Sequence, residues 1–423
     1  MGGSYVSSRR FREQRWLLDN VIRLVGVDWD QGRSRYLAQA CPQEAEGDFT
    51  RVRERVRKFA DIDREFAAAA RRREGFADEA RAEGRRVAER EHAFVAAILW
   101  GAAQWPLFGN TALNLAYGER KVACYQRFIA LAPHPVERVE IPFGEGTLAG
   151  YLHLPATGEG PFPCVMQIGG MDSFKEHLVA IYGDRFLERG IARLTFDGPG
   201  QGEALNRGQW VTATNFVDAG RAVMAWLVRQ PSVDASRIAV SGVSFGSFWA
   251  TQIAGEVGGV QACAVMMALH EPAARTAFES ASPTFKSRFM YMAGYDDEDA
   301  FDRFAAELDP TALGPGIRCP FLVVAGEEDD LSPIEHTWAL LKHAHGPREL
   351  VLFQGERHGI GSGPAAGAGP SRDEIVADWL AARLGGQPLE DRLRYVTTSG
   401  AVITGPLEFD RSVAPVVAGR GPR

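Results

Sequence analysis

One serine lies within a pattern that could make it a nucleophile. It is Ser244, in the stretch 241–247 with the letters SGVSFGS. The apolar run Ile238–Val240 precedes this stretch and a helix-favouring segment follows it, which predicts a sharp turn from strand to helix. Small residues suit such a strained turn because it leaves no room for side chains. The hydroxyl would then lie at a helix N-terminus, where amide dipoles favour developing negative charge.

A serine hydroxyl becomes a strong nucleophile when a histidine takes its proton and a carboxylate orients that histidine. Two later apolar runs are each followed by a residue of the required type, Asp329 and His358. Asp330 is the alternative acid, because two adjacent carboxylates cannot both face one imidazole. The chain order of serine, aspartate and histidine, each placed beyond a strand, predicts a catalytic triad of Ser244, Asp329 and His358.

Acyl chemistry at a serine also needs backbone N–H groups that face the developing alkoxide. The amide of Phe245, directly after the nucleophile, is the first expected donor. An apolar run leads into the glycine-rich turn 169–173, where Gly170 or Met171 is the second expected donor, and a tight turn without a catalytic role is the alternative. The glycine-rich segment 197–203 lacks the spacing and the Lys-Ser/Thr pair of phosphate-binding loops, which favours a structural loop near the site.

The elements that must position these residues follow from the apolar pattern after residue 135. Two short alternating segments around residues 144–146 predict a β-hairpin. Apolar runs typical of buried strands then alternate with helix-favouring stretches, which predicts a doubly wound, mostly parallel α/β sheet. These runs are residues 164–168, 192–196, 238–243, 262–267, 321–325 and 350–353. The loops beyond the carboxyl ends of such strands are the usual place for a catalytic site.

The chain divides into three parts by composition. Residues 1–135 have few strand signals and much Ala, Arg and Glu, and we expect a helical N-terminal domain there. Residues 136–388 are expected to form the catalytic domain, with an insertion near 271–309 that fits no strand. Residues 389–423 are expected to form a loosely packed C-terminal tail. The apolar stretch Ala93–Gly109 is expected to be a buried helix rather than a membrane span.

Composition also limits the expected partners. The net charge of −7 argues against a general binder of nucleic acid or of anionic membranes. Five scattered cysteines without a CxxC pair predict neither a disulfide framework nor a zinc site, and they fit a reducing cytoplasm. No apolar segment follows the first arginines, so no signal peptide is expected. We expect no metal and no cofactor, and a small-molecule carbonyl compound as the substrate.

With these residues assembled, the chain resembles the α/β-hydrolase superfamily. More narrowly, it resembles the group that contains 2,6-dihydroxypseudooxynicotine hydrolase, fungal pigment-pathway chain-shortening hydrolases and fermentation–respiration switch esterase-like proteins. The resemblance is carried by residues 169–176, 196–203, 242–246 and 288–294 and by the loops of Asp329 and His358. It covers most of residues 136–385. It implies an α-helical N-terminal lid over the catalytic face and a homodimer.

The resemblance further implies hydrolysis of a carbon–carbon bond beside a ketone, in a small aromatic or polyketide-like substrate, through an acyl-enzyme. Such a reaction needs a group that assists the departure of the enol or carbanion. Glu271 is the candidate carboxylate, and a helix N-cap or a surface position is its alternative. Trp105, Phe289 and Tyr291 are candidates to line the substrate pocket, with packing in the core as the alternative.

Three other functions are compatible with the same sequence. Ester hydrolysis by the same triad is the second expected reaction. Acyl transfer, elimination or cyclisation would follow if water were excluded from the acyl-enzyme. The alternative that is not an enzyme is a regulatory module that binds another protein through its helical N-terminal region. Such a module has no need of a complete triad.

Overall fold

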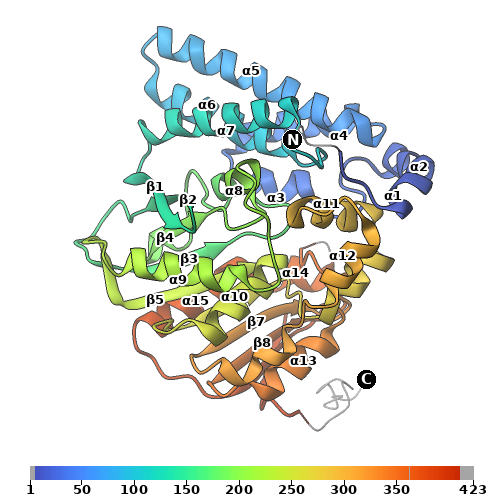
Figure 1. Cartoon of the computed structure of the whole chain (residues 1–423). Helices are drawn as coiled ribbons and strands as arrows, with labels where there is room; N and C mark the ends of the chain where they lie inside the picture. The colour runs from blue at the N-terminus through green and yellow to red at the C-terminus, as the bar shows by residue number, and fades with distance from the viewer. Residues whose placement is uncertain (1–4, 362, 410–423) are drawn as a thin grey trace.

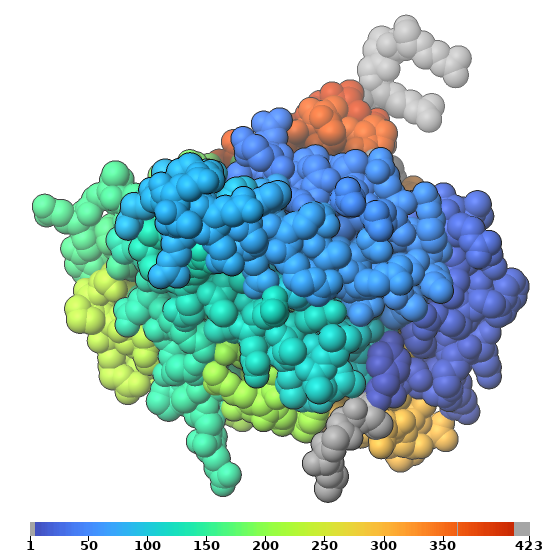
Figure 2. Space-filling model, turned by 90° about the horizontal axis from the view of Figure 1, so that it is seen from above, coloured from blue at the N-terminus to red at the C-terminus, as the bar shows by residue number. Residues whose placement is uncertain are grey.

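The computed structural model describes residues 5–361 and 363–409. A helical layer, residues 9–129, lies above a sheet domain (Figure 1). Seen from above, this layer, drawn blue to teal, covers most of the visible face (Figure 2). Its elements are α1 (Arg9–Glu13), α2 (Arg15–Val25), α3 (Arg33–Gln39), η1 (Gln43–Ala45), α4 (Glu46–Arg55), η2 (Phe59–Asp61), α5 (Ile62–Ala82), α6 (Arg86–Gln104) and α7 (Ala112–Ile129).

Helix α6 is the centre of the helical layer and packs against both α5 and α7. Its residues 93–103 are all buried, which confirms the buried helix expected in this apolar stretch. Helix α7 begins at Thr111, whose hydroxyl accepts the N–H of Asn114 (3.2 Å) and satisfies one of the free amides at the helix start. Within the described residues, no helix combines the length and apolar character needed to span a membrane.

In the part of the chain that the structure describes, ten strands form one sheet in the order β1-β2-β4-β3-β5-β6-β7-β8-β9-β10. The expected hairpin is β1 with β2, which pairs antiparallel to β4, and the strands from β4 to β9 run parallel. The strands are β1 (Val136–Phe143), β2 (Gly146–His153), β3 (Phe162–Ile168), β4 (Ala192–Phe196), β5 (Val233–Val243), β6 (Cys263–Met266), β7 (Phe321–Gly326), β8 (Arg348–Phe353), β9 (Arg392–Val396) and β10 (Val402–Gly405).

The central strands β4, β6 and β7 are buried on both faces, as expected for parallel strands with helices on either side. In β7, Phe321 and Val323 belong to a core shared with α9, α10 and the helical layer, whereas Leu322 and Val324 belong to a second core with α15. The helices and helical turns of this domain are η3 (Lys175–His177), η4 (Leu187–Arg189), α8 (Gly202–Asn206), α9 (Asn215–Leu227), α10 (Phe245–Glu256), η7 (Thr311–Gly316), α13 (Ile334–His343), α14 (Pro364–Ala368) and α15 (Arg372–Leu384).

The expected insertion between β6 and β7 is helical. It consists of η5 (Pro272–Ala274), a π-helical turn η6 (Thr276–Ser280), α11 (Pro283–Ala293) and α12 (Glu298–Ala305). It meets the N-terminal part of the helical layer, where the hydroxyl groups of Ser8 and Ser287 lie 3.1 Å apart in the interior. The insertion and the first helices therefore form one continuous packed region.

The expectation of a loosely packed C-terminal tail is wrong for residues 392–405. Strand β9 pairs in parallel with β8, and β10 pairs antiparallel with β9. The alternating Val and Thr of this segment suit a strand, and Leu393, Tyr395 and Val396 are buried. The hydroxyl of Tyr395 donates to the carboxylate of Glu327 (3.0 Å), next to the expected acid loop. Residues 410–423 of the expected tail lie outside the described residues.

A buried ionic cluster joins the helical layer to the sheet domain. The ammonium of Lys175 lies 2.7 Å from Asp197, 2.6 Å from Glu203 and 3.0 Å from Glu176. Lys121 of α7 lies 3.5 Å from the other oxygen of Glu176. Burial opposes ionisation of Asp197, but the nearby ammonium groups outweigh this effect and hold its pKa below the usual value. The cluster is thus stable only while its charges remain paired.

Replacing Lys175 with methionine is expected to lower the free energy of unfolding by about 3–5 kcal/mol, because it leaves buried carboxylates without their counter-ion. Urea unfolding followed by tryptophan fluorescence measures this change. Arg221→Met is the matched control, since Arg221 pairs with Asp218 on the surface and its loss should cost less than about 1 kcal/mol.

Lys121→Met is a milder variant for the case that Lys175→Met does not fold, because Glu176 then keeps Lys175 as a partner. Its loss of stability should fall between those of the other two variants. Equal stability of the Lys121→Met and Arg221→Met proteins would show that the pair of Lys121 with Glu176 contributes nothing to holding the two parts together.

Candidate active site

Ser244 lies at a sharp turn between β5 and α10, as the sequence predicts. Its backbone has φ 55° and ψ −126°, a conformation that a residue with a side chain adopts only under strain. A Cβ at Gly242 would collide with the carbonyl of Gly246, and a Cβ at Gly246 would collide with the carbonyl of Ile168. Both glycines are therefore required by close contacts between backbones, which hold Ser244 at the turn.

The structure brings Ser244, His358 and Asp329 together in one hydrogen-bonded line. Ser244 Oγ lies 2.9 Å from His358 Nε2. On the other side of the ring, His358 Nδ1 lies 2.9 Å and 3.1 Å from the two oxygens of Asp329. A carboxylate at Nδ1 favours the tautomer with its proton there, so Nε2 is free to accept the proton of the serine. This geometry suits general-base activation of Ser244.

Of the two adjacent acids, the structure places Asp329 at the imidazole. Its Oδ1 also accepts the N–H groups of Leu331 and Ser332, each at 2.9 Å, which fixes the carboxylate in the loop after β7. The carboxylate of Asp330 instead accepts the backbone N–H of His358 (3.3 Å). Asp329 thus contacts the side chain of His358, and Asp330 contacts its backbone.

The glycine-rich turn after β3 passes directly over Ser244. A Cβ at Gly170 would lie 3.0 Å from the Cβ of Ser244 and 3.5 Å from its Oγ. The N–H of Gly170 already donates to the hydroxyl of Ser173 (3.0 Å). Among the described residues, the N–H groups of Met171 and Phe245 have no acceptor. Of the two donors considered for this turn, the geometry therefore favours Met171, together with Phe245.

Gln201 holds this turn in place and was not singled out by its sequence. Its amide nitrogen donates to the carbonyls of Gly169 (2.8 Å) and Gly170 (3.0 Å), and its amide oxygen accepts the N–H of Gly198 (3.2 Å). In a trans peptide the C=O and N–H groups point in opposite directions. By holding the carbonyl of Gly170, Gln201 therefore fixes the direction of the N–H of Met171.

Ser244 opens into a cavity of about 560 Å³. The residues that form its apolar wall are Met266, Met267, Leu269, Ala277, Phe285 and Leu331. A polar wall includes Gln31, Arg35, Tyr36 and Gln39, which lie on or next to helix α3 of the helical layer. The cavity can hold a small or medium-sized molecule in contact with Ser244. No group of three or more His, Cys, Asp or Glu side chains in the described residues could hold a metal ion.

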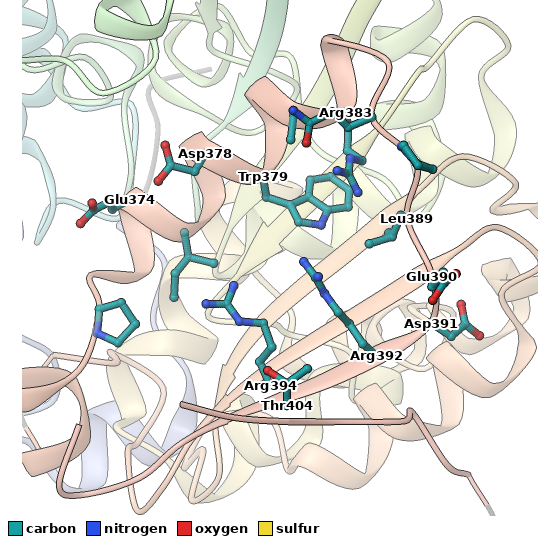
Figure 3. Close-up of a pocket in the computed structure, with 15 residues that line it drawn as sticks. Glu374, Asp378, Trp379, Arg383, Leu389, Glu390, Asp391, Arg392, Arg394 and Thr404 are labelled. Atoms are coloured by element: carbon teal, nitrogen blue, oxygen red, sulfur yellow. The ribbon is translucent and has the colours of Figure 1, made fainter. Parts of the chain in front are cut away.

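A larger cavity of about 730 Å³ lies between α15 and the strands β9 and β10 (Figure 3). Arg392 and Arg394 point from β9 toward α15, which carries Trp379 and Arg383. Arg392 pairs with the buried Glu349 (2.7 Å) beneath them. No described residue that lines this cavity is a serine, cysteine or histidine, and none was predicted as a site residue. The smaller cavity at Ser244 is therefore the candidate active site.

Glu271 does not reach the cavity, although the sequence made it a candidate for the leaving group. Its carboxylate accepts the backbone N–H of Thr276 (2.7 Å) and the hydroxyl of Thr276 (3.0 Å). It does not line the cavity at Ser244. The carboxylate makes no capping bond to η5, which it precedes, and instead binds Thr276 at the start of η6, so it serves a local structural contact.

Trp105, Phe289 and Tyr291, the predicted pocket residues, pack in the core and do not line the cavity. The guanidinium of Arg33 lies 3.9 Å from the ring centre of Trp105. The ring of Phe289 is 4.4 Å from that of Phe245, and the hydroxyl of Tyr291 donates to a side chain of the helical layer. The sequence identified the aromatic insertion but not the face of α11 that meets the cavity, where Phe285 lies.

Replacing Gln201 with glutamate is expected to slow acylation of Ser244, because a carboxylate cannot donate to the two carbonyls and would repel them. The rate constant for labelling by a fluorophosphonate, which forms an oxyanion at the serine, should fall by about ten-fold or more. Gln230→Glu is the matched control, since Gln230 donates to the carbonyl of Trp226 away from the cavity. Equal labelling rates of the two variants, with both proteins folded, would contradict a positioning role for Gln201.

Comparison with known protein families supports this assignment of the fold. The model of the family described as Esterase FrsA-like matches residues 71–293, which is more than half of the chain. The α/β hydrolase xenA of Xenoacremonium sinensis is 33% identical over 195 residues, or 44% of this chain and 46% of that protein. Esterase FrsA of Yersinia pestis (strain Pestoides F) is 29% identical over 153 residues, or 36% of each. The chain spans less than half the length of these curated relatives.

Solved structures show the same fold over a longer stretch. The structure of 2,6-dihydroxy-pseudo-oxynicotine hydrolase is similar with a TM-score of 0.68 and 23% identity, over 89% of this chain and 99% of that one. AbyA5 is similar with a TM-score of 0.59 and 17% identity, over 75% of this chain and 89% of that one. These likenesses show the shared fold and confirm the expected α/β-hydrolase architecture. With the family match over residues 71–293, they establish that this chain belongs to the FrsA-like esterase family of α/β-hydrolases.

Proposed function

We propose that this chain is a serine hydrolase that cleaves a carbon–carbon bond beside a ketone in a small aromatic or polyketide-like substrate. The observation that carries the proposal is the hydrogen-bonded line from Asp329 through His358 to Ser244, which ends in a cavity. A nucleophile, a base and an orienting carboxylate in this geometry form the set that acyl transfer from a carbonyl compound requires.

In the proposed mechanism, Ser244 Oγ attacks the carbonyl carbon while its proton passes to His358 Nε2. The oxyanion accepts hydrogen bonds from the amides of Phe245 and Met171. When the tetrahedral intermediate collapses, the bond between the carbonyl carbon and its neighbour breaks, and the electron pair leaves with the neighbouring carbon. His358 returns the proton to that fragment. A water molecule, deprotonated by His358, then attacks the acyl-serine and releases a carboxylic acid and free Ser244.

A 1,3-diketone is the simplest substrate for this reaction. Its second carbonyl accepts the electron pair of the leaving carbon as an enolate, so the leaving group needs one proton and no further charged residue. His358 holds that proton after it has activated Ser244. The apolar wall formed in part by Met266, Leu269 and Phe285 suits an uncharged aromatic or acyl chain.

Ester hydrolysis is the second candidate. The observation that favours it is the description of the matching family as esterase-like. An alkoxide or phenoxide also leaves more readily than a carbanion, so the same triad would suffice.

The two reactions are separated by measuring kcat/KM on 1-phenyl-1,3-butanedione and on phenyl benzoate. Turnover of the diketone at a rate comparable to or above that of the ester is expected. Turnover of the ester alone would assign the protein as an esterase. Mass spectrometry of the products distinguishes hydrolysis from acyl transfer, and a trapped acyl group should map to Ser244.

Ser244→Ala is the test of the mechanism itself. Its kcat should fall by at least about 10³-fold on whichever substrate reacts, because the triad acts as a unit. Circular dichroism and fluorophosphonate labelling serve as checks that the variant is folded and has lost the reactive hydroxyl. A Ser244→Ala protein that retains wild-type turnover would overturn the proposed mechanism.

A further inference from the structure

Helix α3 gives the cavity its polar wall. Arg35, Tyr36 and Gln39 lie on one face of this helix, since residues three and four apart are neighbours on a helix surface, and all three line the cavity. On its other side, Arg33 is buried and donates to the carboxylate of Asp172 (3.1 and 2.6 Å), two residues beyond Gly170. This ion pair fixes α3 against the turn over Ser244, so Arg35 is held at the cavity.

The carboxylates of the cavity wall already have partners. Asp172 pairs with Arg33 (2.6 Å), and Asp184 pairs with Arg193 (2.6 Å), both in the protein interior. Asp373 lies 3.7 Å from Arg372, whose guanidinium also donates to the carbonyl of Ile360 (2.7 Å). These three aspartates are the acidic residues among the described residues that line the cavity, and each is matched by an arginine.

Two arginines that line the same cavity, Arg35 and Arg185, have no such partner. In the part of the chain that the structure describes, the guanidinium groups of Arg35 and Arg185 make no ion pair and no hydrogen bond to the protein, and both side chains are exposed at the cavity. His177 adds no charge at neutral pH, because burial lowers the pKa of its imidazole to about 4. The wall therefore carries an excess of positive charge, in a chain whose net charge is −7.

We propose that the substrate carries an anionic group, a carboxylate or a group of the same charge, and that Arg35 and Arg185 bind it. The inference rests on the proposed hydrolase function, because it concerns the same cavity, and it adds the substrate class. The reacting carbonyl lies at Ser244 beside the apolar wall, and the anionic group lies toward α3. Arg35 and Arg185 are specificity-determining residues in this arrangement.

The chemistry of arginine supports this role. A guanidinium binds a carboxylate through two parallel hydrogen bonds, and such charge-assisted bonds are stronger than neutral ones. Each hydrogen bond to a charged group is worth about ten-fold to a hundred-fold in binding. Positive charge at the mouth of a cleft also raises the local concentration of an anionic ligand, an effect that salt screens.

Matched pairs of esters test the inference. Mono(4-nitrophenyl) glutarate and 4-nitrophenyl pentanoate differ by a carboxylate on the acyl side. 4-Acetoxybenzoate and 4-methylphenyl acetate differ by a carboxylate on the leaving side. For at least one pair, the ratio of kcat/KM for the anionic ester to that for the neutral ester should fall by about ten-fold or more in the Arg35→Gln/Arg185→Gln double variant. In the wild type, added salt should reduce the same ratio.

Arg221→Gln is the matched control, because this arginine is exposed on α9 and does not line the cavity. Its ratio should equal that of the wild type. A double variant with the same ratio as the wild type for both pairs would overturn the inference. So would a ratio that is insensitive to salt.

A binding measurement separates failure of the inference from failure of the proposed function. Titration calorimetry with the Ser244→Ala protein gives Kd for the same four esters without turnover. Tighter binding of an anionic ester, lost in the triple variant that also carries Arg35→Gln and Arg185→Gln, supports the inference even if the wild type hydrolyses none of the esters. Equal Kd values within both pairs overturn it, whatever the wild type hydrolyses.

Discussion

The close contact of three backbone segments around Ser244 is the constraint on which the rest of the site depends. The carbonyls of Ile168 and Gly169, at the end of β3, lie against Gly246 at the start of α10, and Gly246 in turn lies against Gly242 at the end of β5. No side chain fits between these segments. Backbone contacts alone therefore fix the relative positions of the serine hydroxyl, the amide that follows it and the turn after β3. The remaining residues of the site provide proton transfer and contacts to the substrate.

The turn after β3 is also where the two parts of the molecule meet. Within a few residues it contains Met171, whose amide is an expected oxyanion donor, Asp172, which pairs with Arg33 of α3, and Lys175, which is the centre of the buried ionic cluster. Gln201 holds the same turn from the loop after β4. A displacement of the helical layer would therefore move the turn that carries an expected oxyanion donor. The helical layer thus shapes the polar wall of the cavity and also supports the reactive centre.

The sequence predicted those features that depend on local pattern. The strands, the hairpin and the turn at Ser244 follow from apolar runs and glycines, and Asp329 and His358 follow from their places directly after strands. Features that depend on the rotation of a helix could not be predicted in the same way. Phe289 and Tyr291 lie on the core side of α11 while Phe285 of the same helix faces the cavity, and only packing against neighbours decides between these faces. The sequence left the role of Glu271 open, because its partner, Thr276, lies in a π-helical turn that has no clear sequence signal.

Strand β9 shows a second kind of limit. Its residues alternate as a strand requires, but the segment is short and follows two glycines, and its partner β8 is distant in sequence. A short strand is stabilised by pairing with a neighbouring strand and not by its own propensity. The sequence alone therefore did not distinguish β9 from a loosely packed tail.

The residues that line the cavity come from two stretches of the chain. The reactive serine and the turn over it lie within residues 71–293, the stretch that the family model matches, whereas α3, which carries Arg35, lies before it. Ser244 and the turn over it are therefore part of the stretch that matches the family, as is Arg185, whereas Arg35 lies before that stretch. Helix α3 is held by its buried residues Arg33, Ser34 and Leu37, so it can exchange its exposed side chains without disturbing the backbone contacts around Ser244. Exchange of the exposed side chains of α3 can thus alter which substrate binds while the reaction at Ser244 stays the same.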